Sequence, residues 1–215
     1  MSSAKLQGGA SGTGSVTLLA PNTNNTDVLT LPDVAADTLV GAAATQTLTN
    51  KTLGSGLVAG ASYLTSGTAV ASTSGTSIDF TSIPSWVKRI TVMFNGVSTS
   101  GTSLIQVQIG SGSVTNTGYA GACGNRAAET FFTSGFLAFY SSAPSAANLL
   151  SGSMVISLVT ANTWSETSIN AASATQAPAF GAGSVSLGGT LDRVRITTVN
   201  GTDTFDAGSI NILWE

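Results

Sequence analysis

The sequence contains no histidine and a single cysteine, Cys123. Histidine is the side chain that most often acts as a general base near neutral pH, and it is the commonest metal ligand. Its absence excludes Ser-His-Asp and Cys-His catalysis and any histidine-ligated zinc site. One cysteine cannot form an intrachain disulfide, so we expect no redox pair.

Charged residues are scarce as well, with 7 basic and 10 acidic side chains making up 8% of the chain. So few basic residues cannot form the positive stripe that nucleic acid requires, and we expect no nucleic-acid partner. The sequence also lacks an apolar run of about 18 residues, which excludes a membrane-spanning helix. The first residues, MSSAKLQGG, contain no apolar segment, and we expect no secretory signal there.

Apolar residues are nevertheless plentiful at 42% of the chain, which argues against disorder. Val, Ile and Thr alternate with small polar residues, as on pleated, half-buried strands. Strand patterns recur at short spacing with hardly any helical periodicity. We therefore predict an all-β fold, a jelly-roll-like antiparallel β-sandwich over residues 61–215.

Two runs carry the clearest strand patterns. Trp86, Lys88, Ile90, Val92 and Phe94 share one face of a predicted strand, and an Asn-Gly turn at 95–96 should end it. Ile105, Val107 and Ile109 alternate with Gln106 and Gln108, which predicts a strand buried on one face. Further strands are expected near 133–140, 152–159, 163–170, 193–199 and 209–214, with a short pulse at 204–205. An Asn-Gly hairpin turn is expected at 200–201.

Residues 1–60 form a separate, extended segment in this interpretation. Two short apolar pulses, at 15–20 and 27–31, each end at a proline, and an Ala/Thr/Asn tract without aromatic residues follows. Residues 34–44 fit a short helix capped by Asp33, and residues 45–53 fit an extended strand equally well. Such a segment cannot build a core alone, so we expect it to order against other copies or a larger assembly.

We predict that the chain is not an enzyme. A serine–lysine pair would need Lys51 or Lys88, and nothing around either marks an activated nucleophile. The carboxylates that could support glycoside hydrolysis are Asp203, Asp206, Glu129 and Glu166. The first two read as turn residues and the last two are isolated in the sequence.

No cofactor or metal site is expected either. The glycine-rich run at 8–14 follows no predicted strand and contains no lysine, so it is not a phosphate-binding loop. No loop carries enough aspartates for calcium.

Aromatic side chains are the remaining binding candidates. Such side chains stack on sugar rings or anchor protein partners when they are exposed. The alternative is that most of them fill the core or a subunit interface, and this alternative is favoured. The candidates lie in or beside the less regular middle of the chain: Tyr119, Phe131, Phe132, Tyr140 and Trp164.

Two blocks resemble a module of tail-fibre and other surface proteins of tailed bacteriophages: IDFTSIPSWVKRITVMFNGVSTSG at 78–101 and LDRVRITTVNGTDTFDAGSINILWE at 191–215. The elements GSVTLLAP…LTLP and TQTLTNKTL are similar to segments found upstream in such fibres. Residues 112–190 resemble no known segment. The resemblance implies a homotrimeric virion appendage with residues 1–60 as its anchor and collar and residues 61–215 displayed outward.

The expected function is that of a viral structural protein, a short tail fibre on the virion surface whose distal β-sandwich attaches to the host. Its expected partners are other copies of itself, other virion proteins, and a host surface glycan or protein. Assembly in the host bacterial cytoplasm is expected. The chain has no long shaft, so a capsid decoration or head-fibre protein is the main alternative, and a surface polysaccharide depolymerase is a distant one.

Overall fold

The computed structural model describes residues 64–140, 144–173 and 178–215, and these residues form strands and loops without a helix. The predicted segment 1–60, its two strand pulses and the helix or strand alternatives at 34–53 lie outside them. The described strands are β1 (Thr65–Ser66), β2 (Val70–Ala71), β3 (Ser77–Thr81), β4 (Arg89–Thr99), β5 (Ile105–Ser111), β6 (Ser113–Val114), β7 (Ala120–Gly124), β8 (Glu129–Phe132), β9 (Phe136–Leu137), β10 (Leu150–Thr160), β11 (Thr163–Ala172), β12 (Ala179–Ser186), β13 (Arg193–Thr198) and β14 (Phe205–Trp214).

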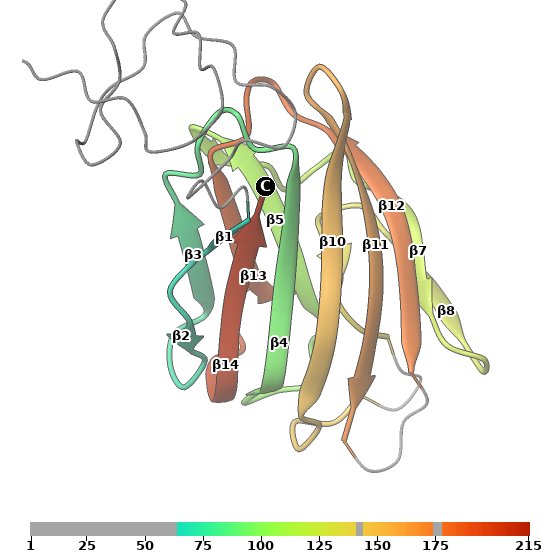
Figure 1. Cartoon of the computed structure of the whole chain (residues 1–215). Coiled ribbons are helices and arrows are strands. Elements are labelled where there is room, and N and C mark those ends of the chain that lie inside the picture. The colour runs from blue at the N-terminus through green and yellow to red at the C-terminus, as the bar shows by residue number, and fades with distance from the viewer. Residues whose placement is uncertain (1–63, 141–143, 174–177) are drawn as a thin grey trace, which may run out of the picture. The chain divides into compact units, whose positions relative to one another are not determined.

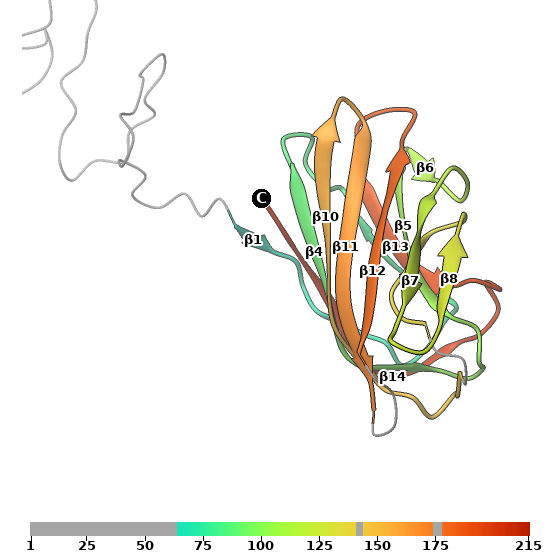
Figure 2. The same cartoon turned by 90° about the vertical axis from the view of Figure 1, so that its right-hand side faces the viewer.

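The strands form two antiparallel sheets. The large sheet runs β1-β14-β4-β10-β11-β12-β7-β8, with β2 also paired to β14. The small sheet runs β3-β13-β5-β6, with β9 also paired to β5. Figure 1 shows β14, β4, β10, β11 and β12 side by side, and Figure 2 shows β5 and β13 in a second layer. The predicted all-β, sandwich-like fold is confirmed.

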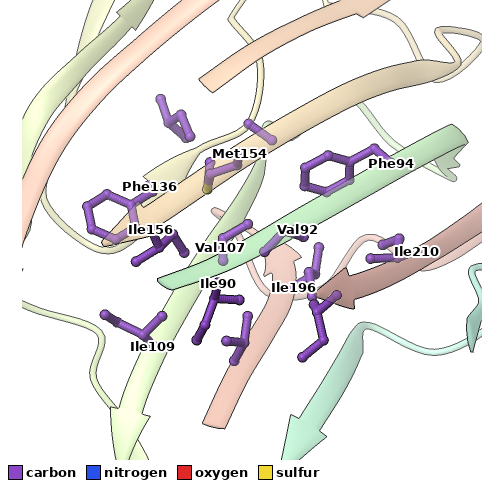
Figure 3. Close-up of a cluster of buried hydrophobic side chains, with 14 of the residues drawn as sticks. Ile90, Val92, Phe94, Val107, Ile109, Phe136, Met154, Ile156, Ile196 and Ile210 are labelled. Carbon is purple, nitrogen blue, oxygen red and sulfur yellow. The ribbon is translucent and has the colours of Figure 1, made fainter. Parts of the chain in front are cut away.

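The core lies between the two sheets and is built by alternation. On β4, Ile90 and Val92 are fully buried while Thr91 between them is not. On β5, Val107 and Ile109 are fully buried as predicted, but Gln106 and Gln108 on the opposite face are buried as well, at 3% and 7% exposure, so the prediction of burial on one face only is wrong. Each buried aliphatic side chain contributes about 1.5–3 kcal/mol when it leaves water. Figure 3 shows this cluster, in which side chains of both layers meet: Ile90, Val92, Phe94, Val107, Ile109, Phe136, Met154, Ile156, Ile196 and Ile210.

The Asn-Gly pair at 95–96 is a β-bulge inside β4, so the predicted turn there is wrong. From Phe94 to Val97 β4 advances three residues, while its neighbour β10 advances only two, from Gly152 to Leu150. The glycine of the pair has φ +63°, a conformation that side chains other than glycine rarely adopt. The same two residues that close a hairpin elsewhere here bend one long strand.

The second Asn-Gly pair does form a turn, but it does not form a hairpin. Gly201 has φ +69°, and its N–H donates to the carbonyl of Thr198 over 3.0 Å. The strands on either side belong to different sheets, β13 to the small one and β14 to the large one. The predicted pulse at 204–205 and strand at 209–214 are one strand, β14.

The strand predicted from Trp86 begins later, at Arg89. The N–H of Val87 donates to the carbonyl of Pro84, which makes a turn before β4. Trp86 is 52% exposed and Val87 is buried, the reverse of the expected pattern. The strands expected near 152–159 and 163–170 are present as β10 and β11, whereas 133–140 contains only the two residues of β9.

Candidate binding surfaces

The four carboxylates considered for glycoside hydrolysis do not converge. Asp203 accepts hydrogen bonds from the N–H of Ser103 (2.9 Å) and the amide of Asn200 (2.7 Å), which is turn chemistry as predicted. Asp206 lies in strand β14, so its predicted turn role is wrong, and it accepts a hydrogen bond from the hydroxyl of Ser98. Glu129 is exposed on β8, and Glu166 is buried on β11. Strand pairing places these two glutamates on opposite faces of the large sheet.

Other chemistry-bearing groups are equally dispersed. Lys88 is exposed in the loop before β4, and Lys51 lies outside the described residues. Within the described ranges, no group of three acidic or cysteine side chains is placed to hold a metal ion. No helix there is long and apolar enough to cross a membrane.

The aromatic candidates separate into buried and exposed side chains. Tyr119, Phe132 and Trp164 are each less than 5% exposed, and Tyr140 is half-buried against the core. Phe131 is 79% exposed. Their role in receptor binding stays a prediction, but only Phe131 presents most of its ring at the described surface.

Packing explains why Tyr119 points inward. Its ring meets Phe136 edge-to-face with centroids 4.8 Å apart, and Phe136 meets Phe132 in the same way at 5.8 Å. The Tyr119 hydroxyl accepts from the N–H of Ile109 over 2.8 Å and donates to the carbonyl of Thr115. Burial raises the pKa of Tyr119, so the phenol stays neutral.

The side chains on the inward face of strand β11 are mostly polar. They form a polar row of Trp164, Glu166, Ser168 and Asn170, each at most 5% exposed. The Asn170 amide donates to the carbonyl of Ala138 over 2.8 Å. The remaining polar atoms of the row have no hydrogen-bond partner: the Trp164 indole N–H, both Glu166 oxygens, the Ser168 hydroxyl and the Asn170 carbonyl oxygen.

Glycines beside β11 make room for this row. Gly181 pairs with Ser168, and Gly183 pairs with Glu166. A Cβ at Gly181 would lie 2.5 Å from the Ser168 hydroxyl and 3.4 Å from a Glu166 oxygen. A Cβ at Gly183 would lie 2.6 Å from the ring of Phe132. The ring therefore packs against bare backbone, and the polar side chains occupy space that larger neighbours would fill.

Burial sets the ionisation of Glu166. It raises the pKa of Glu166 to about 7, and the nearby Ser168 hydroxyl, which favours the charged form, offsets this rise only in part. Burial, together with the Glu166 charge, raises the pKa of the Cys123 thiol to about 12. The thiol is 1% exposed, so it is neither ionised nor accessible at neutral pH.

The outer face of the large sheet carries an apolar row across β11, β12, β7 and β8. Ile169 and Phe180 are direct cross-strand partners. Beyond Phe180 their row continues through Gly124 to Glu129, and Phe131 pairs with Ala122 in the next row. The three large side chains Phe131, Ile169 and Phe180 are 79%, 62% and 58% exposed. We call these three residues the apolar row.

The small sheet carries a polar groove of about 330 Å³ on its outer face. Arg195 lines this groove and forms a two-point ion pair with Asp79 on the adjacent strand β3, at 2.7 and 3.1 Å. Gln106 and Gln108, which alternate with the buried core residues of β5, bond the hydroxyl and carbonyl of Ser134 over 2.9 and 2.8 Å. The groove is lined by hydroxyls, amides and this one ion pair: Thr76, Ser77, Gln106, Gln108, Val114, Asn116, Arg195, Thr197, Thr198, Val199, Asn200 and Gly201.

Sequence reasoning missed both surfaces. The groove assembles from strands far apart in the chain, and its only local signal was the pair of glutamines in β5. Ile169 and Phe180 each alternate with small or polar residues, and alternation alone does not say which face meets solvent.

Comparison of the chain with protein-family models, with curated proteins and with solved structures finds no match.

Proposed function

We propose that this chain is a structural protein of a tailed-bacteriophage virion, a short homotrimeric fibre whose β-sandwich binds the host surface. Residues 1–60 would anchor it to the particle. The observation that carries the proposal is the pairing of the two blocks that resemble phage-fibre modules. Residues 78–101 contain β4 and most of β3, and residues 191–215 contain β13 and β14.

These blocks pair strand by strand although about 90 residues separate them. β3 pairs with β13 through Ile78 and Ile196, and β4 pairs with β14 through Val92 and Ile212. Each block therefore contributes one strand to each pair. The pair β3–β13 lies in the small sheet, and the pair β4–β14 lies in the large sheet. A module shared among fibre proteins needs such a unit, because strands shared without their partners could not bury a core.

The polar groove is the receptor site in this proposal. It lies on the small sheet and offers side chains that bond neutral polar groups, while its one strong charge, Arg195, is already paired with Asp79. The residues that line the groove include no carboxylate and no cysteine. A surface of this kind holds a host component without changing it.

Adsorption tests this function. The full-length protein should bind cells of the phage's host and slow adsorption of the phage. Replacing Arg195 and Asn116 with alanine should reduce that binding about tenfold or more. The control is Lys88→Ala, which removes one positive charge from the exposed loop before β4. Failure of the unmodified protein to bind cells or compete would count against a receptor-binding fibre.

A capsid decoration protein is the second candidate. The outer face of the large sheet is broad and almost uncharged, which suits close packing in a regular layer. Immunogold labelling of the virion separates the two functions. Label on the tail supports the fibre, and label over the whole head supports the decoration protein.

A further inference from the structure

The outer face of the large sheet combines exposed apolar bulk with an almost complete lack of charge. Strand register defines three rows on this face, of which the first two run from β14 to β8 and the third from β4 to β7. One row contains Asn211, Met93, Ser153, Ile169, Phe180, Gly124 and Glu129. The next contains Leu213, Thr91, Val155, Thr167, Ala182, Ala122 and Phe131. The third contains Arg89, Ser157, Ser165, Ser184 and Ala120.

We propose that this face, centred on the apolar row Phe131, Ile169 and Phe180, is covered by a neighbouring copy of this chain. The proposal rests on the proposed function only in that the protein is an oligomer, and it adds which face holds the copies together. A single copy would leave three large apolar side chains mostly in water, which soluble monomers rarely do over a contiguous patch.

The size of the face fits an interface between proteins. From β4 to β8 it spans six strands. At about 4.8 Å between strands and about 3.4 Å per residue over seven residues, it covers roughly 600 Å². Two such faces bury about 1,200 Å² together, the lower end of the range for specific interfaces. Aromatic side chains at the centre, with few charges around them, are what interface cores contain.

The charges favour another copy over an unrelated partner. The three rows carry Arg89 at β4, which is ion-paired with Glu215 of the same chain, and Glu129 at β8 at the opposite end. Between them, Ser, Thr, Ala and Gly dominate. Neighbouring copies can therefore approach without setting like charges against each other, and no patterned charge selects a foreign protein. A glycan is a poorer occupant because the row offers phenyl and aliphatic groups without long hydrogen-bonding side chains beside them.

Thiol protection tests the face directly. Ala182 is exposed and points outward between the strands of Phe131 and Ile169. In the full-length Ala182→Cys variant, we expect the introduced thiol to react with a maleimide at least tenfold more slowly in concentrated than in dilute protein. The matched control is Val199→Cys, which is 50% exposed on a loop between the sheets and should react equally fast at both concentrations. Native Cys123 is buried and contributes little signal.

Association should weaken when the row is made polar. In sedimentation velocity, the full-length Phe131→Ser/Ile169→Ser/Phe180→Ser variant should dissociate at a protein concentration about 100-fold higher than the unmodified chain. Trp86→Ser/Val199→Ser removes comparable exposed apolar bulk elsewhere and should leave association unchanged.

The outcomes separate the two proposals. An oligomer in which the Ala182→Cys thiol reacts as fast as the control overturns the interface and leaves the trimer standing. A chain that stays monomeric up to high concentration overturns both. Slow reaction at the face in an assembly of any copy number supports the interface, and the measured mass then decides whether the assembly is the proposed trimer.

Discussion

The two halves of the large sheet divide polar and apolar side chains between their faces in opposite ways. Around β4 and β14 the interior holds Ile90, Val92 and Ile212, and the outward residues are mainly polar. Around β11 the interior holds Glu166 and Ser168, while a large apolar side chain, Ile169, stands outside. Both halves alternate with period two. Alternation of residue types in the sequence therefore identifies a strand. Which of its two faces packs against the core depends on the neighbouring strands.

The glycines of β12 and β7 explain the inverted half. Gly181, Gly183 and Gly121 offer no side chains for β11 to pack against, and the ring of Phe132 lies within 2.7 Å of where their Cβ atoms would be in two of the three cases. Aliphatic packing needs partners on both sides. With backbone as the neighbour, β11 keeps small and polar groups, and stability in this half depends less on hydrophobic burial.

The largest expected effect comes from removing aliphatic volume in the first half. Ile90→Ala should lower the free energy of unfolding by about 4 kcal/mol, because it leaves a cavity in a fully buried site. Urea denaturation of the full-length protein measures this. Ile169→Ala, the same change on the outward face of β11, is the control and should cost less than about 1 kcal/mol when both variants are measured at a concentration at which the chain is monomeric. Equal losses at the two sites would mean that the faces are not divided as described.

The second prediction concerns the pH dependence of the inverted half. Folding raises the pKa of Glu166 from 4.5 to about 7, so between these values the folded state holds a proton that the unfolded state has released. Stability from this group is therefore full below pH 4.5, falls as pH rises towards 7, and is level above it. The loss should be about 3 kcal/mol.

Glu166→Gln removes this titration while keeping the size of the side chain. Unfolding free energies measured at pH 5 and pH 8 should differ less in the variant than in the unmodified protein. If the two proteins show parallel pH profiles, Glu166 is not buried as an isolated carboxyl group.

The third prediction tests whether the glycines make room for the polar row. Gly181→Ala should cost about 2 kcal/mol, because its Cβ would lie 2.5 Å from the Ser168 hydroxyl. Adding Ser168→Ala should recover part of the loss, which a double-mutant cycle by urea denaturation would show as coupling. Gly188→Ala, with no atom within 4 Å of the new Cβ, is the control. Additive effects would contradict a direct contact.

The smallest effect is expected at the outer face of the small sheet. Arg195→Ala breaks the two-point pair with Asp79, yet both side chains are more than a third exposed, so thermal unfolding should show a loss of at most about 1 kcal/mol. A loss above about 2 kcal/mol would mean that the polar groove supports the fold. Arg195→Ala can report on receptor binding only if its effect on stability is this small.

Much of the first half could be predicted from sequence. In the fibre-like blocks the strands β4, β13 and β14 were expected, although β3 was missed, and in the small sheet the spacing of Val107 and Ile109 identified β5 and its core-facing side. Those elements are regular, and their inward residues are the large aliphatic ones, so periodicity and hydrophobicity agree. The same agreement led to the prediction that most aromatic residues fill the core.

Other features depended on partners that are distant in the chain. The bulge at 95–96 arises because β10 and β14 continue beside β4 on both sides, which no local pattern reports. The turn at 200–201 contains the Asn-Gly pair typical of hairpins, but the strand before it, β13, and the strand after it, β14, belong to different sheets. The groove on the small sheet likewise exists only once β5 and β13 pair, so its residues could not be selected from sequence alone.

The order in which the strands emerge during synthesis has a consequence for how the protein is made. β14 lies between β4 and the pair β1 and β2, and β13 lies between β3 and β5. Both central strands come from residues 193–214, so neither layer closes until translation has reached them. Until then β4 and β5 each keep an open edge, a site for mispairing between nascent chains. A chain truncated before β13 and β14 should therefore aggregate rather than form a smaller folded domain.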